Sequence, residues 1–328
     1  MDVVPERPEV VKAGLLSIAD TDIVTFGELP GLAGRPGSIT ALLDAARLPG
    51  LPARIKASGA AALSLFDGSK AAQKLRDVAP YLVSLNGELS QLQALLGGPD
   101  DLTAKPRVLH GILLLSSLGL NPLRRHFRRF LHAEAEGRPC LFRFWDPPAA
   151  IAYFDAIARA EDRWHWFSPR EGGLIDAILV PDGVPDRLRA YRAGPIPAGP
   201  ARPIRPFRLG TDELAALKAT RSQVGEDQLV AQMNAAFPQL VTQIGAEDFD
   251  RIVRKTALRC AGFGISQHAH LFRIAAWDLH ARGRFEDVDP GHELARILAA
   301  DLNEVEKMRG LAARIATLAP ANSQLPID

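Results

Sequence analysis

Three aspartates each follow an apolar run of the chain, where strands of an α/β sheet are expected to end. They are Asp44, Asp67 and Asp146. Open α/β sheets bind ligands beyond the carboxyl ends of their strands, and grouped carboxylates are ligands that Mg²⁺ accepts. If the three side chains met at one site, they would suit metal-dependent hydrolysis or phosphoryl transfer.

The local context of these aspartates favours a structural role. Asp67 precedes Gly68 and Ser69 at an expected helix start, and Asp146 precedes Pro147. An aspartate followed by proline at the first helical position is a common helix N-cap. Capping is therefore the favoured interpretation, and a metal-dependent hydrolase using the three aspartates is the alternative.

The other motifs that usually mark an active site are missing from the sequence. It contains no GxSxG elbow, no Walker loop, no HExxH and no CxxC. Gly262-Phe263-Gly264 follows an expected helix and not a strand, which indicates a helix end and not a dinucleotide loop. The sequence thus predicts no catalytic residue, no metal ligand and no cofactor.

A cluster of four arginines is the strongest local feature. In the stretch 123–131 (LRRHFRRFL), Leu123, Phe127, Phe130 and Leu131 share one face of a helix. The opposite side carries Arg124, Arg125, Arg128 and Arg129. These guanidinium groups are candidates for binding partner carboxylates, and an arginine face that is solvated or paired within the chain is an equally good interpretation.

The elements around these residues alternate. Apolar runs at 39–43, 61–66, 81–85, 108–115, 141–145 and 172–180 predict strands, and helix-like segments at 53–58, 69–78, 88–96 and 122–132 lie between them. This alternation predicts an α/β domain with a mostly parallel or mixed sheet. Runs that are apolar on both faces favour central strands with helices on both sides.

The chain changes character after residue 192. We expect an irregular N-terminal extension at 1–37, an α/β domain at 38–192, a Pro/Gly-rich linker at 193–206 and an all-helical domain at 207–320. In the last part, helical periodicity marks 211–219, 227–237, 246–261, 267–281 and 293–316.

Composition restricts the class of protein. The formal net charge is +1, which favours neither general nucleic-acid binding nor a membrane-surface role. The N-terminus has no basic region followed by an apolar core, and no apolar stretch reaches the ~20 residues that span a bilayer. Two cysteines far apart in sequence fit a reducing compartment. We therefore expect a cytoplasmic protein that neither inserts into membranes nor binds nucleic acid.

Beyond these patterns, residues 42–147 resemble the effector chaperones of type VI secretion, the Tap/Tec adaptor family. The matching pieces, in chain order, are Leu42-Leu43-Asp44-Ala45-Ala46-Arg47, Ser64-Leu65-Phe66-Asp67-Gly68, Ala79-Pro80-Tyr81-Leu82-Val83, the arginine stretch at 123–131, and Leu141-Phe142-Arg143-Phe144-Trp145-Asp146-Pro147. The sequence departs from the family pattern at 97–106, which lacks the usual tryptophan-containing turn.

The resemblance implies delivery of a protein and not catalysis. Adaptors of this family bind a toxic effector in the cytoplasm and help to load it onto the spike protein of the secretion apparatus. By this resemblance, Asp44, Asp67, Arg143, Asp146 and Pro147 form a structural motif. The partners it implies are one effector and the spike protein.

Overall fold

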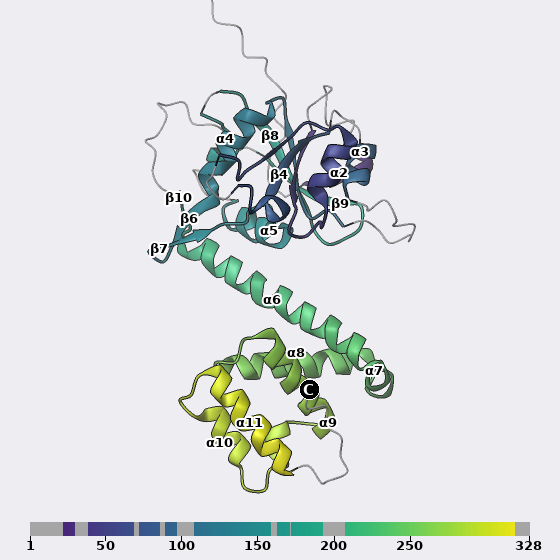
Figure 1. Cartoon of the computed structure of the whole chain (residues 1–328), viewed down its shortest axis with the longest axis vertical. Helices are drawn as coiled ribbons and strands as arrows, with labels where there is room; N and C mark the ends of the chain where they lie inside the picture. Colours follow the sequence, from purple (N-terminus) through teal and green to yellow (C-terminus); the bar gives the residue numbers. More distant parts are fainter. Residues whose placement is uncertain are drawn as a thin grey trace, which may run out of the picture. The chain divides into compact units, whose positions relative to one another are not determined.

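The structure is a computed structural model, and it describes residues 22–29, 39–68, 72–85, 89–96, 108–158, 163–170, 172–192 and 207–318. The chain divides into two compact units, Met1–Lys218 (unit 1) and Ala219–Asp328 (unit 2) (Figure 1). The division lies inside one long helix. The expected linker at 193–206 lies outside the described residues.

A seven-stranded sheet forms the centre of unit 1. Its strands are β1 (Asp22–Thr25), β2 (Ile39–Asp44), β3 (Ala62–Ser64), β4 (Pro80–Ser84), β5 (Gly111–Ser116), β8 (Ile175–Pro181) and β9 (Arg187–Arg192), in the order β1-β9-β8-β5-β2-β4-β3. Every neighbouring pair is antiparallel. The expected parallel or mixed arrangement is therefore wrong for this main sheet, which is antiparallel throughout.

The connections explain why the alternation of helices and strands was misleading. Helix α2 (Leu51–Ser58) joins β2 to β3, and α3 (Leu89–Leu96) joins β4 to β5. Each helix connects two strands that run in the same direction, as a crossover requires. In each case, however, an antiparallel strand lies between the two, β4 in the first and β2 in the second.

Both faces of the sheet are covered, as the apolar runs predict. On β5, Ile112 and Leu114 belong to one buried cluster, and Leu113 and Leu115 belong to another. Helices α2 and α3 cover the face of Leu113 and Leu115. The other face is covered by α4 (Leu120–Leu131) and α5 (Pro147–Ala156), and Figure 1 shows α4 on the opposite side of the strands from α2 and α3.

A second, smaller sheet lies beside α4. It consists of β6 (His132–Ala135), β7 (Arg138–Leu141) and β10 (Phe207–Arg208), in the order β10-β6-β7. The predicted strand at 141–145 is wrong, because β7 ends at Leu141. Phe142, Phe144 and Trp145 are nevertheless buried, because their rings fill the aromatic core of unit 1 and not a place in a sheet.

Short 3₁₀ helices complete the described part of unit 1. They are η1 (Phe26–Glu28), η2 (Arg76–Val78) and η3 (Arg163–Trp166). The predicted helix at 69–78 is wrong for its described residues, which form turns and η2. Strand β1 and η1 lie in the segment expected to be irregular, because β1 pairs with β9 at the edge of the sheet.

All regular secondary structure in the described part of unit 2 is helical. The helices are α6 (Thr211–Ala236), which begins in unit 1, α7 (Pro238–Ile244), α8 (Ala246–Gly262), α9 (His268–Ala281), η4 (Phe285–Val288), α10 (Glu293–Ala299) and α11 (Glu304–Leu318). Two predicted helices are one continuous helix, α6, and the predicted helix at 293–316 is two helices, α10 and α11. As expected, Gly262-Phe263-Gly264 is a helix end, where the φ of Gly264 is +73°.

No helix in the described part of the chain combines the length and the apolar character that crossing a membrane requires.

Candidate functional site

The arginine helix α4 packs on the sheet through the face that its sequence predicts. Leu123 and Phe127 are fully buried, and Phe130 and Leu131 are nearly so. All four belong to the core cluster that contains Ile112 and Leu114 of β5. The apolar face is thus confirmed, and it sets the directions of the four arginines.

Two of those arginines are bound to the turn that follows β3. Arg128 Nη1 donates a hydrogen bond to the backbone oxygen of Asp67, at 2.6 Å. Arg124 Nη1 lies 3.9 Å from Asp67 Oδ2. The same carboxylate oxygen accepts the backbone N–H of Ser64 at 3.0 Å. This part of the arginine face is therefore paired within the chain.

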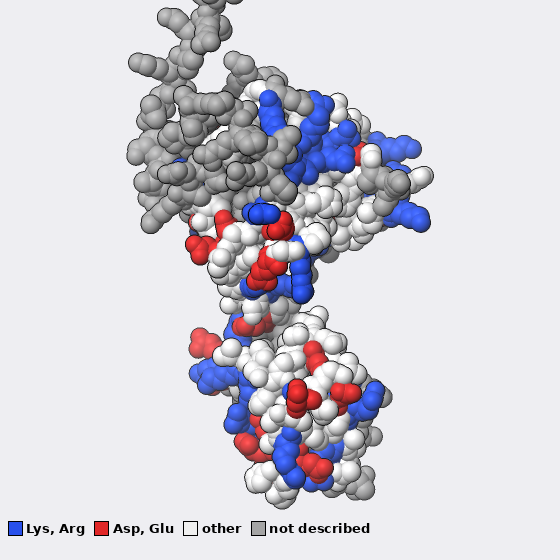
Figure 2. Space-filling view, turned by 90° about the vertical axis from the view of Figure 1, so that its left-hand side faces the viewer, with Lys and Arg blue, Asp and Glu red and all other residues white. Residues whose placement is uncertain are grey.

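The other two arginines have different surroundings. The guanidinium carbon of Arg129 lies 5.4 Å from the centre of the Phe130 ring. Burial, and then the nearby charge of Arg170, lower the pKa of Arg129 below its usual range. Arg125 is exposed. Figure 2 shows Lys and Arg side chains gathered on the face of unit 1 that carries α4.

Asp44 and Asp146 lie in a second group of charges, at one end of β2. Asp44 is buried, pairs with Arg143 and accepts the backbone N–H of Ala46 at 3.0 Å. Arg47 Nη2 lies 3.8 Å from Asp146 Oδ1. Burial raises the pKa of Asp146, and Arg47 and Arg143 oppose that rise. Burial has the opposite effect on His110 in this group: it lowers the pKa of the imidazole, and the charge of Arg47 lowers it further.

The predicted roles of the three aspartates can now be compared with their positions. Asp146 is the N-cap residue of α5, with Pro147 at the start of the helix, but its side chain makes no capping hydrogen bond. Asp67 stabilises a turn and not a helix start. Arg143 pairs with Asp44 and also acts on Asp146, whereas Asp67 pairs with Arg124. Among the described residues, no group of three metal-ligating side chains is placed to hold an ion.

The sequence patterns assigned no role to a histidine of α4 that is buried in the structure. His126 Nε2 lies 2.8 Å from the backbone oxygen of Trp166, and the Phe130 and Trp166 rings stack at 3.8 Å between centres. Because a carbonyl oxygen only accepts, Nε2 carries the proton and donates it. Nδ1 is buried without a partner. Burial lowers the pKa of His126 to about 4, so the side chain is neutral at physiological pH.

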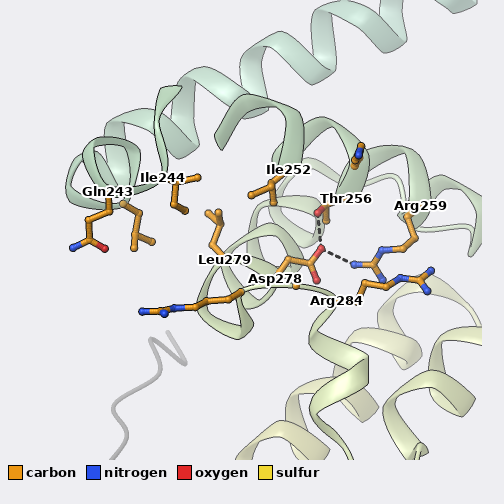
Figure 3. A pocket seen from close by; sticks show the side chains of 12 residues that line it. Gln243, Ile244, Ile252, Thr256, Arg259, Asp278, Leu279 and Arg284 are labelled. Atoms are coloured by element: carbon orange, nitrogen blue, oxygen red, sulfur yellow. Dashed lines mark hydrogen bonds and ion pairs between the residues drawn. The ribbon is translucent and has the colours of Figure 1, made fainter. Parts of the chain in front are cut away.

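Unit 2 contains a cavity of about 700 Å³ that sequence patterns did not predict. Figure 3 shows the side chains that line it. They come from α7, α8 and the end of α9 with the loop after it: Leu240, Gln243, Ile244, Ile252, Lys255, Thr256, Arg259, Asp278, Leu279, Arg282, Gly283 and Arg284. The feature of the sequence that could have drawn attention to this region is the pair of arginines on either side of Gly283.

The polar side of this cavity is organised around Asp278. Its Oδ2 accepts hydrogen bonds from Thr256 Oγ1 at 2.5 Å and from Arg259 Nη2 at 2.6 Å, as the dashed lines of Figure 3 mark. Its Oδ1 accepts the backbone N–H of Phe285 at 2.9 Å. Arg259 also donates to Glu286 Oε1 at 2.5 Å. These groups join α8 to α9 and η4 at one side of the cavity.

Comparison with known proteins gives one family match. Residues 41–163, a little over a third of the chain, match a family described as a domain of unknown function, DUF4123. No curated protein matches the chain. No solved structure matches it either. The match begins within β2 and extends past α5, so it includes the arginine helix and both groups of charges around the three aspartates. This part of unit 1 is therefore similar to DUF4123.

Proposed function

We propose that this chain is a non-enzymatic adaptor, which binds a toxic effector in the bacterial cytoplasm and helps to load it onto the spike protein of a type VI secretion apparatus. The proposal starts from the resemblance of residues 42–147 to the effector chaperones. The DUF4123 match covers the same stretch of the chain.

One observation carries the proposal furthest. The pieces that resemble the adaptor family are widely spaced in sequence, and ion pairs join four of them in two groups. Asp44 of the first piece pairs with Arg143 of the last, and Arg47 of the first lies against Asp146 of the last. Asp67 of the second piece contacts the arginine helix. These contacts join the first piece to the last and the second to the arginine helix, which supports a structural role for their charged residues.

The alternative, a metal-dependent hydrolase, is not favoured by any observation on the described residues. Such an enzyme needs its three carboxylates at one site with room for substrate. Here each carboxylate contacts a different arginine of the same chain, and Asp67 lies in a different group of charges from Asp44 and Asp146. Pairing with arginine competes directly with binding of a cation by the same oxygens.

An adaptor also needs surface for its partners, roughly 800 Å² for each at a stable interface. The face of α4 that carries Arg125 and Arg129 is one candidate for such a surface in unit 1. Because Arg124 and Arg128 are held by Asp67, the part of α4 available to a partner is narrower than the sequence suggests. A partner that contacts it is expected to present carboxylates.

The test is deletion of the gene in the bacterium that encodes it. We expect one effector to disappear from the culture supernatant, while the tube protein of the apparatus is still secreted. Re-expression of the chain should restore the effector, and tagged chain should co-purify with that effector and with the spike protein. An unchanged supernatant, or equal loss of all secreted components, would refute the adaptor role.

A further inference from the structure

The cavity of unit 2 has an apolar wall. Leu240 and Ile244 of α7, Ile252 of α8 and Leu279 of α9 line one side of it. Leu279 is buried, and the other three are partly buried, so they present apolar surface to the cavity. Figure 3 shows Ile244, Ile252 and Leu279 directed toward the same space. This wall is suited to an aliphatic or aromatic group.

The charges around the cavity do not balance. Its lining contains four cations, Lys255, Arg259, Arg282 and Arg284, and one anion, Asp278. Arg259 is compensated by Asp278 and by Glu286, which also lies 3.5 Å from Arg284.

Two cations of the rim have no counter-charge in the described part of the chain. The side chains of Lys255 and Arg282 are exposed and have no ion pair among the residues that the structure describes. They lie on two elements, α8 and the end of α9. The lining therefore combines apolar surface with positive charge that its own acidic residues do not neutralise.

Arg282 occupies a position that usually holds glycine. It follows α9 with a φ of +53°, a left-handed conformation that costs a residue with a β-carbon about 1 kcal/mol or more. The chain nevertheless places arginine there and glycine at the next position, Gly283. The left-handed turn directs a long cationic side chain to the edge of the cavity, where it is a lining residue.

We propose that this cavity binds a segment of a partner protein in which an aliphatic or aromatic side chain lies next to carboxylates. The apolar side chain would fill the space beside Ile244, Ile252 and Leu279, and the carboxylates would pair with Lys255 and Arg282. A volume of about 700 Å³ leaves room for several side chains of such a segment. The inference rests on the proposed function, because it assumes a protein partner.

An array of short peptides tests this chemistry on the full chain. The peptides vary the number of acidic residues and the number of large apolar residues independently, and a third series replaces each acid by lysine. Binding is expected to increase with both acidic and apolar content, and to be absent from the lysine series. Binding that follows apolar content alone, or no binding to acidic apolar peptides, would overturn the proposal.

Substitutions of the lining residues test whether the peptide binds in the cavity. For the strongest array peptide, measured by fluorescence anisotropy, the double variant Lys255→Glu with Arg282→Glu is expected to bind about tenfold more weakly. The matched control is Arg273→Glu with Arg309→Glu. It makes the same change of net charge at exposed residues of unit 2 outside the cavity lining, and its affinity should equal that of the wild type.

A third variant separates binding from folding. Arg282→Gly suits the left-handed backbone, so its melting temperature should not fall, whereas its peptide affinity should decrease about threefold. If Arg282→Gly and the double reversal both bind like wild type, the peptide binds elsewhere and the cavity is not its site.

The outcomes also separate this inference from the adaptor function. If the Lys255→Glu/Arg282→Glu variant still captures effector and spike protein while the peptide affinity is unchanged, the cavity proposal fails and the adaptor function stands. If peptides bind the cavity but deletion of the gene leaves secretion unchanged, the adaptor function fails and the acidic-apolar specificity stands. If a free anionic amphiphile such as anilinonaphthalene sulfonate binds the cavity and no peptide does, the occupant is a small molecule and the proposal is wrong.

Discussion

Arg128 on α4 donates a hydrogen bond to the backbone oxygen of Asp67, with 2.6 Å between the two atoms. This contact joins the arginine helix to the turn after β3, across 61 residues of sequence. The Asp67 carboxylate holds the same turn through the N–H of Ser64. The most basic stretch of the chain therefore fixes a turn of its own domain in addition to presenting charge to solvent.

Arg128→Ala should destabilise unit 1 by about 1 kcal/mol, because the Asp67 carbonyl loses a charged donor while remaining open to water. The free energy of unfolding from urea denaturation checks this value. Arg138→Ala is the control, since Arg138 is an exposed residue of β7, and it should change the free energy by less than about 0.5 kcal/mol. Equal stability of the two variants would contradict the structural role of Arg128.

Arg143→Ala should lower the free energy of unfolding by about 2 kcal/mol, more than Arg128→Ala does. The reason is that the carboxylate of Asp44 stays buried without its cation. A double-mutant cycle with Asp44→Asn isolates the pair. We expect the two single changes to be non-additive, with the double variant more stable than their sum predicts. Additive effects would mean that Arg143 does not compensate Asp44.

Substitutions on the exposed side of α4 should affect partner capture and thermal stability differently. Arg125→Glu is expected to weaken capture of the effector or the spike protein several-fold, and more strongly at low salt, with little change in melting temperature. Arg129→Glu should lower the melting temperature, because the Arg129 guanidinium lies over the ring of Phe130 and is partly buried. Side-by-side pull-down and thermal denaturation give both quantities. If neither variant affects capture, α4 is not a partner surface.

His126 predicts a pH dependence of stability. Burial lowers the pKa of His126 to about 4 in the folded chain, from 6.5 when unfolded. Between pH 6.5 and pH 4, His126 is protonated in the unfolded chain but neutral in the folded chain. Its full contribution to the free energy of unfolding is therefore present above pH 6.5, and it decreases as the pH falls toward 4. The loss should reach about 2 kcal/mol at pH 5.

Urea denaturation at pH 7 and pH 5 measures that loss. The variant His126→Gln keeps a donor for the Trp166 carbonyl and does not titrate, so its stability should change less between the two pH values. The difference between wild type and variant removes the contribution of the other ionisable groups. A difference that does not change with pH would contradict a neutral, buried His126.

Asp289 should be important for the stability of the C-terminal part of unit 2. Its buried carboxylate accepts the backbone N–H groups of Gly291, Glu293 and Leu294 and pairs with Arg314 of α11. Hydrogen bonding to Arg314 holds the pKa of Asp289 well below its usual range. Asp289→Asn should therefore lower the melting temperature, and the exposed residue Asp301 provides the control variant Asp301→Asn.

The effect of Asp289 should also depend on pH. A lowered pKa in the folded state contributes stability above the pKa of the unfolded chain, and that contribution is lost as the pH falls below it. The gap in melting temperature between wild type and Asp289→Asn should thus be largest near neutral pH and should narrow below about pH 4. A gap that is constant down to pH 3 would contradict the ionised state of Asp289.

Local patterns in the sequence determined the elements whose signal is short-range. The helical period at 123–131 places Phe127 and Phe130 on one face, and that face is buried in the structure. The run 111–115 of β5 has no polar side chain, and both of its faces are covered. These features follow from the spacing of side chains along one element, which does not depend on what lies next to it.

Only the tertiary structure decided which elements are neighbours. The alternation of helices and strands is the same whether a crossover joins adjacent parallel strands or skips an antiparallel strand, and here β4 and β2 occupy the skipped places. The run 141–145 is as apolar as a strand, yet its aromatic residues pack without pairing. The partners of Asp44 and Asp67 lie 99 and 61 residues away, so no local pattern could identify them. The cavity of unit 2 forms where three helices meet, because its lining residues come from separate stretches of sequence and become contiguous only when α7, α8 and α9 pack together.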